Sequence, residues 1–304
     1  KGFSMTGFFR LSTATALATL MTSSAVFADV NAQQVWGDMK TYLQGFGYDV
    51  SATEATSGDT LKITDLSMRV KMPDEAGNAS FKISEMTFTN TGDGTVSVGI
   101  PTVMPIIVKI QPKDDKAADV TIDYTQSGFS MIVSGNADDM TYNYTAANIG
   151  MAMTSLLVDG NPVDLGKFEM MMKNVIGSSN MKTGNLRNIS QKMQADILNY
   201  DIDFKDPKQK GAFQMKGALN ALKFDGIGSY PSEMNVDDMA AMLKAGFGFD
   251  GTFAYEGGET MMNVDEKGKQ TDIRSSSDSG TLSVSMGADN LSYVATAKGL
   301  SMNM

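Results

Sequence analysis

The 304-residue chain contains no cysteine and no histidine. Without cysteine it can form no disulfide, thiolate metal site or thiol nucleophile, so its stability must come from core packing. Without histidine it lacks the usual general base at neutral pH and the commonest metal ligand. This excludes Ser-His-Asp hydrolases, histidine-bound zinc and histidine-ligated haem, and leaves an enzyme only carboxylate, lysine, tyrosine or Ser-Lys chemistry. A binding or structural role is therefore expected ahead of catalysis, and no cofactor or metal is expected.

Positive charge is scarce as well. The chain carries 25 Lys and Arg against 35 Asp and Glu, a net charge of −10. Nucleic acids and anionic membrane surfaces attract clusters of Lys and Arg, and the sequence contains no such cluster. We therefore expect no nucleic-acid partner.

Residues 1–28 are typical of a cleavable secretory signal peptide. Met5 is the expected start, and residues 1–4 are an upstream extension. Arg10 supplies the positive charge, residues 11–21 form a short apolar stretch, and Ala28 ends a small-residue cleavage site. The apolar stretch falls short of the ~20 residues that cross a bilayer. We therefore expect a periplasmic protein cleaved after Ala28, with no integral membrane span remaining and, since it lacks cysteine, no lipid anchor.

One helix is expected at the start of the mature chain, capped by Asn31 and ended by Gly45. Its apolar residues recur at helical spacing, and the only tryptophan, Trp36, is predicted to be a packing anchor. A terminal helix of this kind is expected to cover a sheet. A second helix is predicted over 236–245, with Asn235 as its N-cap and Gly246 at its end.

Between the helices the hydrophobic pattern changes to the period of two that is typical of strands. Residues 61–68 and 81–88 match position by position and skip one register at their acidic residues, Asp65 and Glu85. Such a skip indicates a β-bulge, and the turn residues at 73–78 predict a hairpin.

A longer internal similarity relates residues 134–153 to 285–304, with a weaker third copy at 211–224. Each is interpreted as strand, short turn and strand, which predicts a sheet built from repeated hairpins. A further strand is expected over 247–255, followed by turns at 256–259 and 265–269. The stretch 167–198 fits either a strand or a helix. The apolar ending at Leu300, Met302 and Met304 favours a fragment of a longer protein, so residues 29–304 are expected to form one domain truncated at its C-terminus.

Methionine is unusually frequent, with 25 residues. Thioether groups at 170–172, 151–153, 261–262 and 302–304 could bind Cu(I), but no Cys or His accompanies them, so flexible packing of a core or groove is the preferred interpretation. Paired acids at 114–115, 138–139, 237–238 and 201–203 could act as a glycosidase pair or bind calcium, and solvated turns explain them more simply. Glycines at 246–251 lie in a strand pattern and indicate no nucleotide loop.

The segments Gln34–Val50, Ser57–Leu66 and Ala245–Gly258 resemble a family of exported alphaproteobacterial proteins known as domain of unknown function 2125. The resemblance extends over the mature chain and implies a periplasmic location, without a known activity or ligand. In pattern only, the chain is also similar to envelope proteins whose long curved sheets hold lipid chains.

The predicted fold is a mainly β protein: an extended, twisted antiparallel sheet of repeated hairpins, forming a half-pipe or open barrel, with two short helices. The leading hypothesis is a periplasmic, non-enzymatic protein that binds or conducts lipids or other apolar molecules on its inner sheet face. A structural protein of the envelope and a carboxylate hydrolase of envelope glycans remain as alternatives. The candidate apolar ligand-binding residues are Phe129, Met131, Tyr142, Met151, Met153, Phe213, Phe224, Phe247, Phe249, Phe253 and Tyr255.

Overall fold

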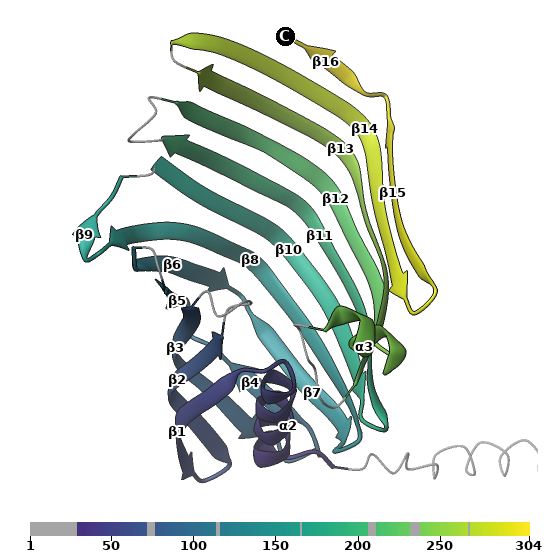
Figure 1. Cartoon of the computed structure of the whole chain (residues 1–304). Helices are drawn as coiled ribbons and strands as arrows, with labels where there is room; N and C mark the ends of the chain where they lie inside the picture. The colour runs from purple at the N-terminus through teal and green to yellow at the C-terminus, as the bar shows by residue number, and fades with distance from the viewer. Residues whose placement is uncertain are drawn as a thin grey trace, which may run out of the picture.

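The computed structural model describes residues 29–71, 77–113, 116–164, 166–205, 211–231, 238–266 and 268–304. The expected signal peptide at 1–28 and two of the acidic pairs, at 114–115 and 237–238, lie wholly or partly outside these ranges. The described residues form two helices and one 16-stranded antiparallel sheet (Figure 1). This confirms the fold class predicted from the sequence.

The helices and strands follow one another along the chain in this order: α2 Ala32–Gly45, β1 Asp49–Ser57, β2 Thr60–Lys71, β3 Gly77–Asn90, β4 Val96–Gly99, β5 Val103–Pro112, β6 Ala118–Ser127, β7 Ser130–Asn136, β8 Asp139–Val158, β9 Asn161–Pro162, β10 Gly166–Lys182, β11 Leu186–Lys205, β12 Ala212–Pro231, α3 Met239–Lys244, β13 Gly248–Glu266, β14 Lys269–Gly287, β15 Asn290–Lys298 and β16 Ser301–Asn303.

The sheet is a meander with one fork. From β8 to β15 each strand pairs with the next long strand, in the order β8-β10-β11-β12-β13-β14-β15. Between β3 and β8 the sheet divides, because β3 pairs with both β4 and β5, and β8 pairs with both β6 and β7. The two branches, β4–β7 and β5–β6, rejoin at β8. The fork therefore joins the short N-terminal strands to the long strands that begin with β8.

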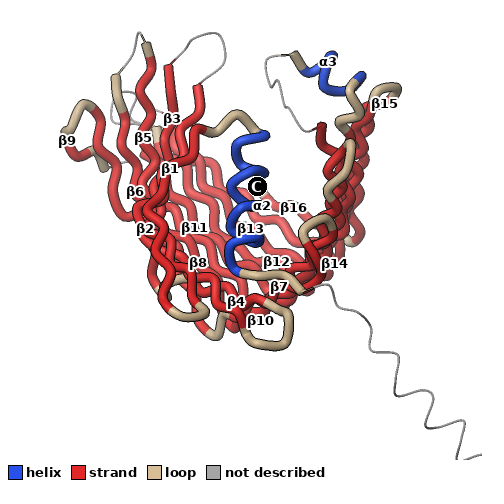
Figure 2. The backbone as a smooth tube through the Cα atoms, turned by 90° about the horizontal axis from the view of Figure 1, so that it is seen from below, coloured by secondary structure: helices blue, strands red, loops and turns tan. Residues whose placement is uncertain are grey.

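The sheet curves into an open trough. Figure 2 shows α2 inside this trough, between the strands around β2 on one side and β14 on the other. Asn31 caps the helix, since its side chain accepts from the Gln34 backbone while the Gln34 side chain accepts from the Asn31 backbone. The helix ends at Gly45, and the glycine with positive φ that follows is Gly47 (83°). The helix boundaries predicted from the sequence are confirmed, but Gly47 rather than Gly45 provides the left-handed residue.

The main hydrophobic core lies between α2 and the concave face of the N-terminal strands. Trp36 is 2 % exposed and packs against Phe88, with ring centroids 6.0 Å apart. Ile63 and Val133 contribute to the same cluster and are fully buried. The role of Trp36 as a packing anchor is therefore confirmed, and the helix side of the sheet is the concave side.

The predicted β2–β3 hairpin is present, with Leu61 opposite Phe88 and Met68 opposite Phe81. The bulge at Asp65 is confirmed, since its φ is 53° and the β1–β2 register shifts there. The bulge predicted at Glu85 is not a register shift against β2. Instead β3 changes partner around it, pairing with β5 through Lys82 and with β4 from Thr87 onward.

A kink line crosses the sheet from the junction of β6 and β7 to the junction of β15 and β16. Along it, single residues interrupt the ladder hydrogen-bond register, and several adopt positive φ, among them Asn174 (51°), Ala221 (47°) and Gly257 (85°). One residue of this kind shifts the side-chain alternation, so the same face stays concave on both sides of the bend. The kink line consists of Gly128, Ala147, Asn174, Asp196, Ala221, Gly257, Asp278 and Gly299.

The stretch 167–198, whose sequence fits either a strand or a helix, is strand in β10 and β11, apart from the hairpin turn between them. Two other local predictions are corrected. Residues 256–259 form no turn, because β13 runs through them and bends at the kink line. The third proposed hairpin, 211–224, is wrong: its residues from Ala212 onward lie in the single strand β12.

The second helix is shorter than predicted. It begins at Met239 with Asp238 as its N-cap, whose carboxylate accepts from the Ala241 backbone, and the predicted cap Asn235 lies outside the described residues. The two long similar stretches do form hairpins with turns at matching positions, since Asn136 pairs with Asp139 and Gly287 with Asn290.

Candidate binding trough

On the far side of the kink line from α2, the concave face carries no helix among the described residues (Figure 1). We call this part of the concave face the open half of the trough. Residues directly opposite one another in neighbouring strands point to the same face of a sheet, so the strand register groups its side chains into four rows that run across the strands.

The first row lies next to the kink line. Its residues Ile149, Met172, Leu198 and Leu219 are opposite one another on β8, β10, β11 and β12. They pack against the buried Ala146, Val175, Ala195 and Leu222 on the other side of the bend. The open half is therefore continuous, through this cluster, with the part of the concave face that α2 covers.

The next three rows follow at intervals of two residues. The second contains Tyr124, Met151, Met170, Tyr200, Gly217 and Thr260. The third contains Ile122 and Met153 on one side, and Phe168, Ile202, Met215 and Met262 on the other. The fourth contains Phe204, Phe213 and Val264. None of the residues in these rows is charged.

Two tyrosine hydroxyls in or beside the open half are hydrogen-bonded to neighbouring hydroxyl groups. The Tyr200 hydroxyl lies 2.5 Å from Thr260 Oγ1, and the Tyr255 hydroxyl lies 2.9 Å from Ser277 Oγ. A hydroxyl whose hydrogen bond is already made costs little to remove from water. The rows therefore behave as a continuous apolar surface.

Charged side chains gather on the opposite, convex face. Lys167 lies 3.0 Å from Asp201 and 2.9 Å from Glu169, and Lys216 lies 3.5 Å from the same Asp201. Lys109 pairs with Asp119 in the same manner on β5 and β6. Alternation of this kind places these charged side chains on the convex face and the side chains of the four rows on the concave face.

Among the described candidate acids, Asp201 and Asp139 have pKa values shifted below the usual range of a carboxyl group. The hydrogen bond from Lys167 lowers the pKa of Asp201, and the hydrogen bond from Asn180 lowers the pKa of Asp139. A glycosidase acid needs the opposite, a raised pKa that keeps its proton at neutral pH. Within the described residues no group of three or more acidic side chains is placed to hold a metal ion.

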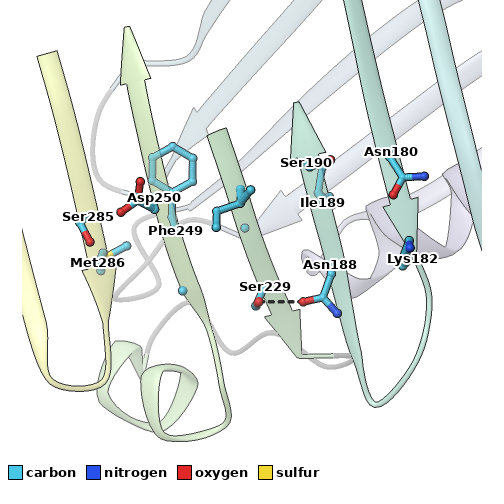
Figure 3. Close-up of a pocket in the computed structure, with 13 residues that line it drawn as sticks. Asn180, Lys182, Asn188, Ile189, Ser190, Ser229, Phe249, Asp250, Ser285 and Met286 are labelled. Carbon is cyan, nitrogen blue, oxygen red and sulfur yellow. Dashed lines mark hydrogen bonds between the residues drawn. The ribbon is translucent and has the colours of Figure 1, made fainter. Parts of the chain in front are cut away.

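The convex face also carries a shallow depression of about 520 Å³ across β10 to β14, drawn in Figure 3. Its lining mixes polar and apolar side chains: Asn188 and Ser229 are bonded to each other at 2.8 Å, Lys182 lies on β10 and Asp250 lies on β13. Exposed side chains that bond across a twisted sheet explain this depression without a ligand.

The structure places the candidate residues on one sheet face but not in one site. Met151, Met153 and Phe213 belong to the second, third and fourth rows of the open half. Tyr255 lies beside the kink line, with its hydroxyl on Ser277. These four residues border the uncovered surface.

The other candidates lie on the α2 side of the kink line. Tyr142 and Met131 belong to the core beneath α2, and burial strongly raises the pKa of Tyr142. Phe247 contacts Tyr230, with ring centroids 5.6 Å apart. Phe129 and Phe253 pack against the cluster of Ala146, Val175, Ala195 and Leu222. The strand register places Phe224 and Phe249 on the same concave face.

Sequence reasoning missed much of the open half, including Phe168, Met170, Tyr200, Met215 and Met262. Methionine runs such as 170–172 and 261–262 straddle both faces, since Met170 and Met262 are concave whereas Met171 and Met261 are 42 % and 53 % exposed on the convex face. The two-residue alternation of strands, applied separately to the segments before and after the kink, could have distinguished the concave methionines from the convex ones.

Among the described residues, no helix is long and apolar enough to span a membrane. The chain matches no family model, no curated protein and no solved structure.

Proposed function

We propose that the protein binds lipid acyl chains in the open half of the trough and performs no chemistry on them. The observation that carries this proposal is the set of four uncharged rows that no second layer of the described residues covers. An apolar sheet face is ordinarily buried against another layer. Here Met151 remains 36 % exposed and Phe204 42 % exposed, which leaves apolar surface for a ligand.

The dimensions suit an acyl chain. Leu219 and Phe213 mark the first and fourth rows on β12, and six residues at ~3.3 Å per residue separate them by about 20 Å. One acyl chain extends through half of a ~30 Å hydrocarbon core, or about 15 Å. Across the strands, the rows extend from β6 to β13 at ~4.8 Å per strand, enough for chains to lie side by side.

The composition supports a lipid over a fixed small molecule. Met151, Met170, Met172, Met215 and Met262 give the surface flexible, polarisable side chains that adapt to different shapes. A site for one defined small molecule usually adds converging polar groups that orient it, whereas the Tyr200 and Tyr255 hydroxyls here bond to neighbouring hydroxyl groups. The periplasmic location expected from the sequence would give such a trough a role in shielding acyl chains from water.

The first test is the chemical content of the purified protein. Full-length protein with its leader, purified from a bacterial periplasm without detergent, should release phospholipid or fatty acid on organic extraction, detected by mass spectrometry. Protein that carries no lipid and takes up none from vesicles of phosphatidylethanolamine and phosphatidylglycerol would contradict the proposal. A face-to-face dimer of empty protein would favour the structural alternative.

Neighbouring methionines provide matched variants. Met170→Lys and Met262→Lys each place a charge in the open half, whereas Met171→Lys and Met261→Lys place it on the convex face. Burying an unpaired ammonium against an acyl chain costs several kcal/mol, so only the concave variants should lose bound lipid. Equal lipid content in all four variants, or equal loss, would refute the assignment of the face.

A further inference from the structure

Aromatic rings on the concave face lie flat over glycines. A Cβ atom added at Gly280 would come within 3.0 Å of the Tyr255 ring, and one added at Gly217 would come equally close to the Tyr200 ring. The same arrangement recurs at Gly177 beneath Tyr144, Gly226 beneath Phe224, Gly228 beneath Tyr230 and Gly251 beneath Phe249. Each ring therefore occupies the space that a side chain at the glycine position would need.

Two of these rings are also held down by hydrogen bonds. Tyr200 on β11 reaches across Gly217 on β12 to Thr260 on β13. Tyr255 on β13 reaches across to Ser277 on β14, next to Gly258 and Gly280. A strand side chain normally stands perpendicular to its sheet, so the glycine beneath the ring and the hydroxyl beyond it together keep the ring flat.

A flat ring makes the trough deeper than an upright one. Sheets that pack through upright side chains lie ~10 Å apart, so each layer contributes about 5 Å, whereas a ring in contact with the backbone adds one atomic layer of about 3.5–4 Å. An upright tyrosine, with its long ring axis away from the sheet, projects further still. The tyrosine–glycine pairs therefore lower the floor of the trough along β11 to β14.

We propose that the Tyr200–Gly217 and Tyr255–Gly280 pairs determine specificity in the trough, because the depth they provide sets the bulk of the apolar ligand that fits. This inference rests on the proposed lipid binding. A ring raised from the floor excludes a rigid fused-ring lipid before it excludes a single flexible chain, since the chain can bend around the obstacle.

Gly280 is the better of the two positions for a test. Its φ is not in the left-handed region, and the three atoms nearest to an added Cβ all belong to the Tyr255 side chain. At Gly217 the added Cβ would also meet the Glu259 carbonyl oxygen, which would disturb the strand itself. Gly184→Ala is the control, because nothing lies closer than 3.6 Å to its Cβ position.

The experiment compares two fluorescent probes, cis-parinaric acid as a linear chain and dehydroergosterol as a fused-ring lipid, on delipidated full-length protein. Gly280→Ala should weaken dehydroergosterol binding about tenfold and parinaric acid binding less than threefold. The double variant Gly280→Ala/Tyr255→Ala, which removes the ring, should restore dehydroergosterol binding. Gly184→Ala should bind both probes as the parent does, and circular dichroism should show that all four proteins are folded.

The outcomes separate the two proposals. If the parent protein binds neither probe, the proposed function fails and this inference fails with it. If the parent binds both probes but Gly280→Ala weakens them equally or not at all, the specificity role alone is overturned. Failure of the double variant to recover dehydroergosterol binding would likewise overturn it.

Discussion

One buried ion pair, together with ring contacts of Tyr42 and Phe46 on Tyr230, attaches α2 to the C-terminal strands. Arg187 on β11 donates to Asp38 on α2 through both terminal nitrogens, at 2.7 and 3.0 Å, and both side chains are only 11 % exposed. The Arg187 guanidinium also lies 5.3 Å from the centre of the Tyr42 ring. The helix therefore spans the trough, from the Trp36–Phe88 contact on one side to this pair on the other.

Breaking the pair should be costly. Removing one partner of a buried pair costs ~3–5 kcal/mol because the other charge is left without compensation. With 11 % of each side chain exposed, we expect Asp38→Ala to lower the free energy of unfolding by about 2–3 kcal/mol. Arg187→Ala should cost up to ~1 kcal/mol more, since it also loses the cation–π contact.

A double-mutant cycle isolates the interaction itself. The double variant Asp38→Ala/Arg187→Ala should be more stable than the sum of the single effects, by a coupling energy of about 1–2 kcal/mol. The control pair Lys192 and Asp225, 3.4 Å apart with side chains 76 % and 65 % exposed, should show at most ~0.5 kcal/mol. Urea unfolding followed by the fluorescence of Trp36 measures both cycles, and a coupling no larger than that of the control would refute the reasoning.

Three further results are expected. Asn31→Ala should lower the free energy of unfolding by about 1 kcal/mol in urea unfolding, because it removes the capping box of α2. Ala221→Gly should raise the free energy of unfolding by about 0.5 kcal/mol. A left-handed conformation costs an L-residue ~1–2 kcal/mol, and glycine's greater unfolded-state entropy offsets part of the gain. The control Ala218→Gly should lower the free energy of unfolding. Burial, with repulsion from Tyr230, raises the pKa of Tyr42 from 10.0 to about 12. The protonated phenol is therefore favoured by the fold, and stability should be constant below pH 10 and fall by up to ~1 kcal/mol per pH unit between pH 10 and 12, with a smaller slope in Tyr42→Phe.

Much of the fold follows from local patterns. Asn31, the apolar spacing after it and the lone Trp36 predict α2 correctly, because a capping box and an amphipathic stripe are short-range features. The alternation at 61–68 and 81–88 predicts the β2–β3 hairpin and the bulge at Asp65 for the same reason. Neither pattern depends on distant partners.

Two of the errors arose where the kink line crosses a strand. Ala221 and Gly257 shift the alternation in mid-strand, so a turn at 256–259 and a third hairpin at 211–224 were predicted where the strands continue through. The same shift explains why the rows that contain Phe168, Met170 and Tyr200 were not predicted. Strict two-residue alternation continued across Asn174 assigns side chains beyond it to the wrong face of the sheet. Contacts with neighbouring strands determine which residue adopts the left-handed conformation. A single sequence does not show which strands will be neighbours.

The kink line also limits how such a chain can change its length. The long strands β8 and β10 to β14 all bend at the same level, so a single residue inserted within one strand would displace its bend from those of both neighbours and turn half of its apolar side chains outward. Insertions and deletions should therefore be tolerated at the hairpin turns, or as whole hairpins that carry their own bends. A hairpin added in that way would lengthen the apolar surface by about 10 Å without altering the rest.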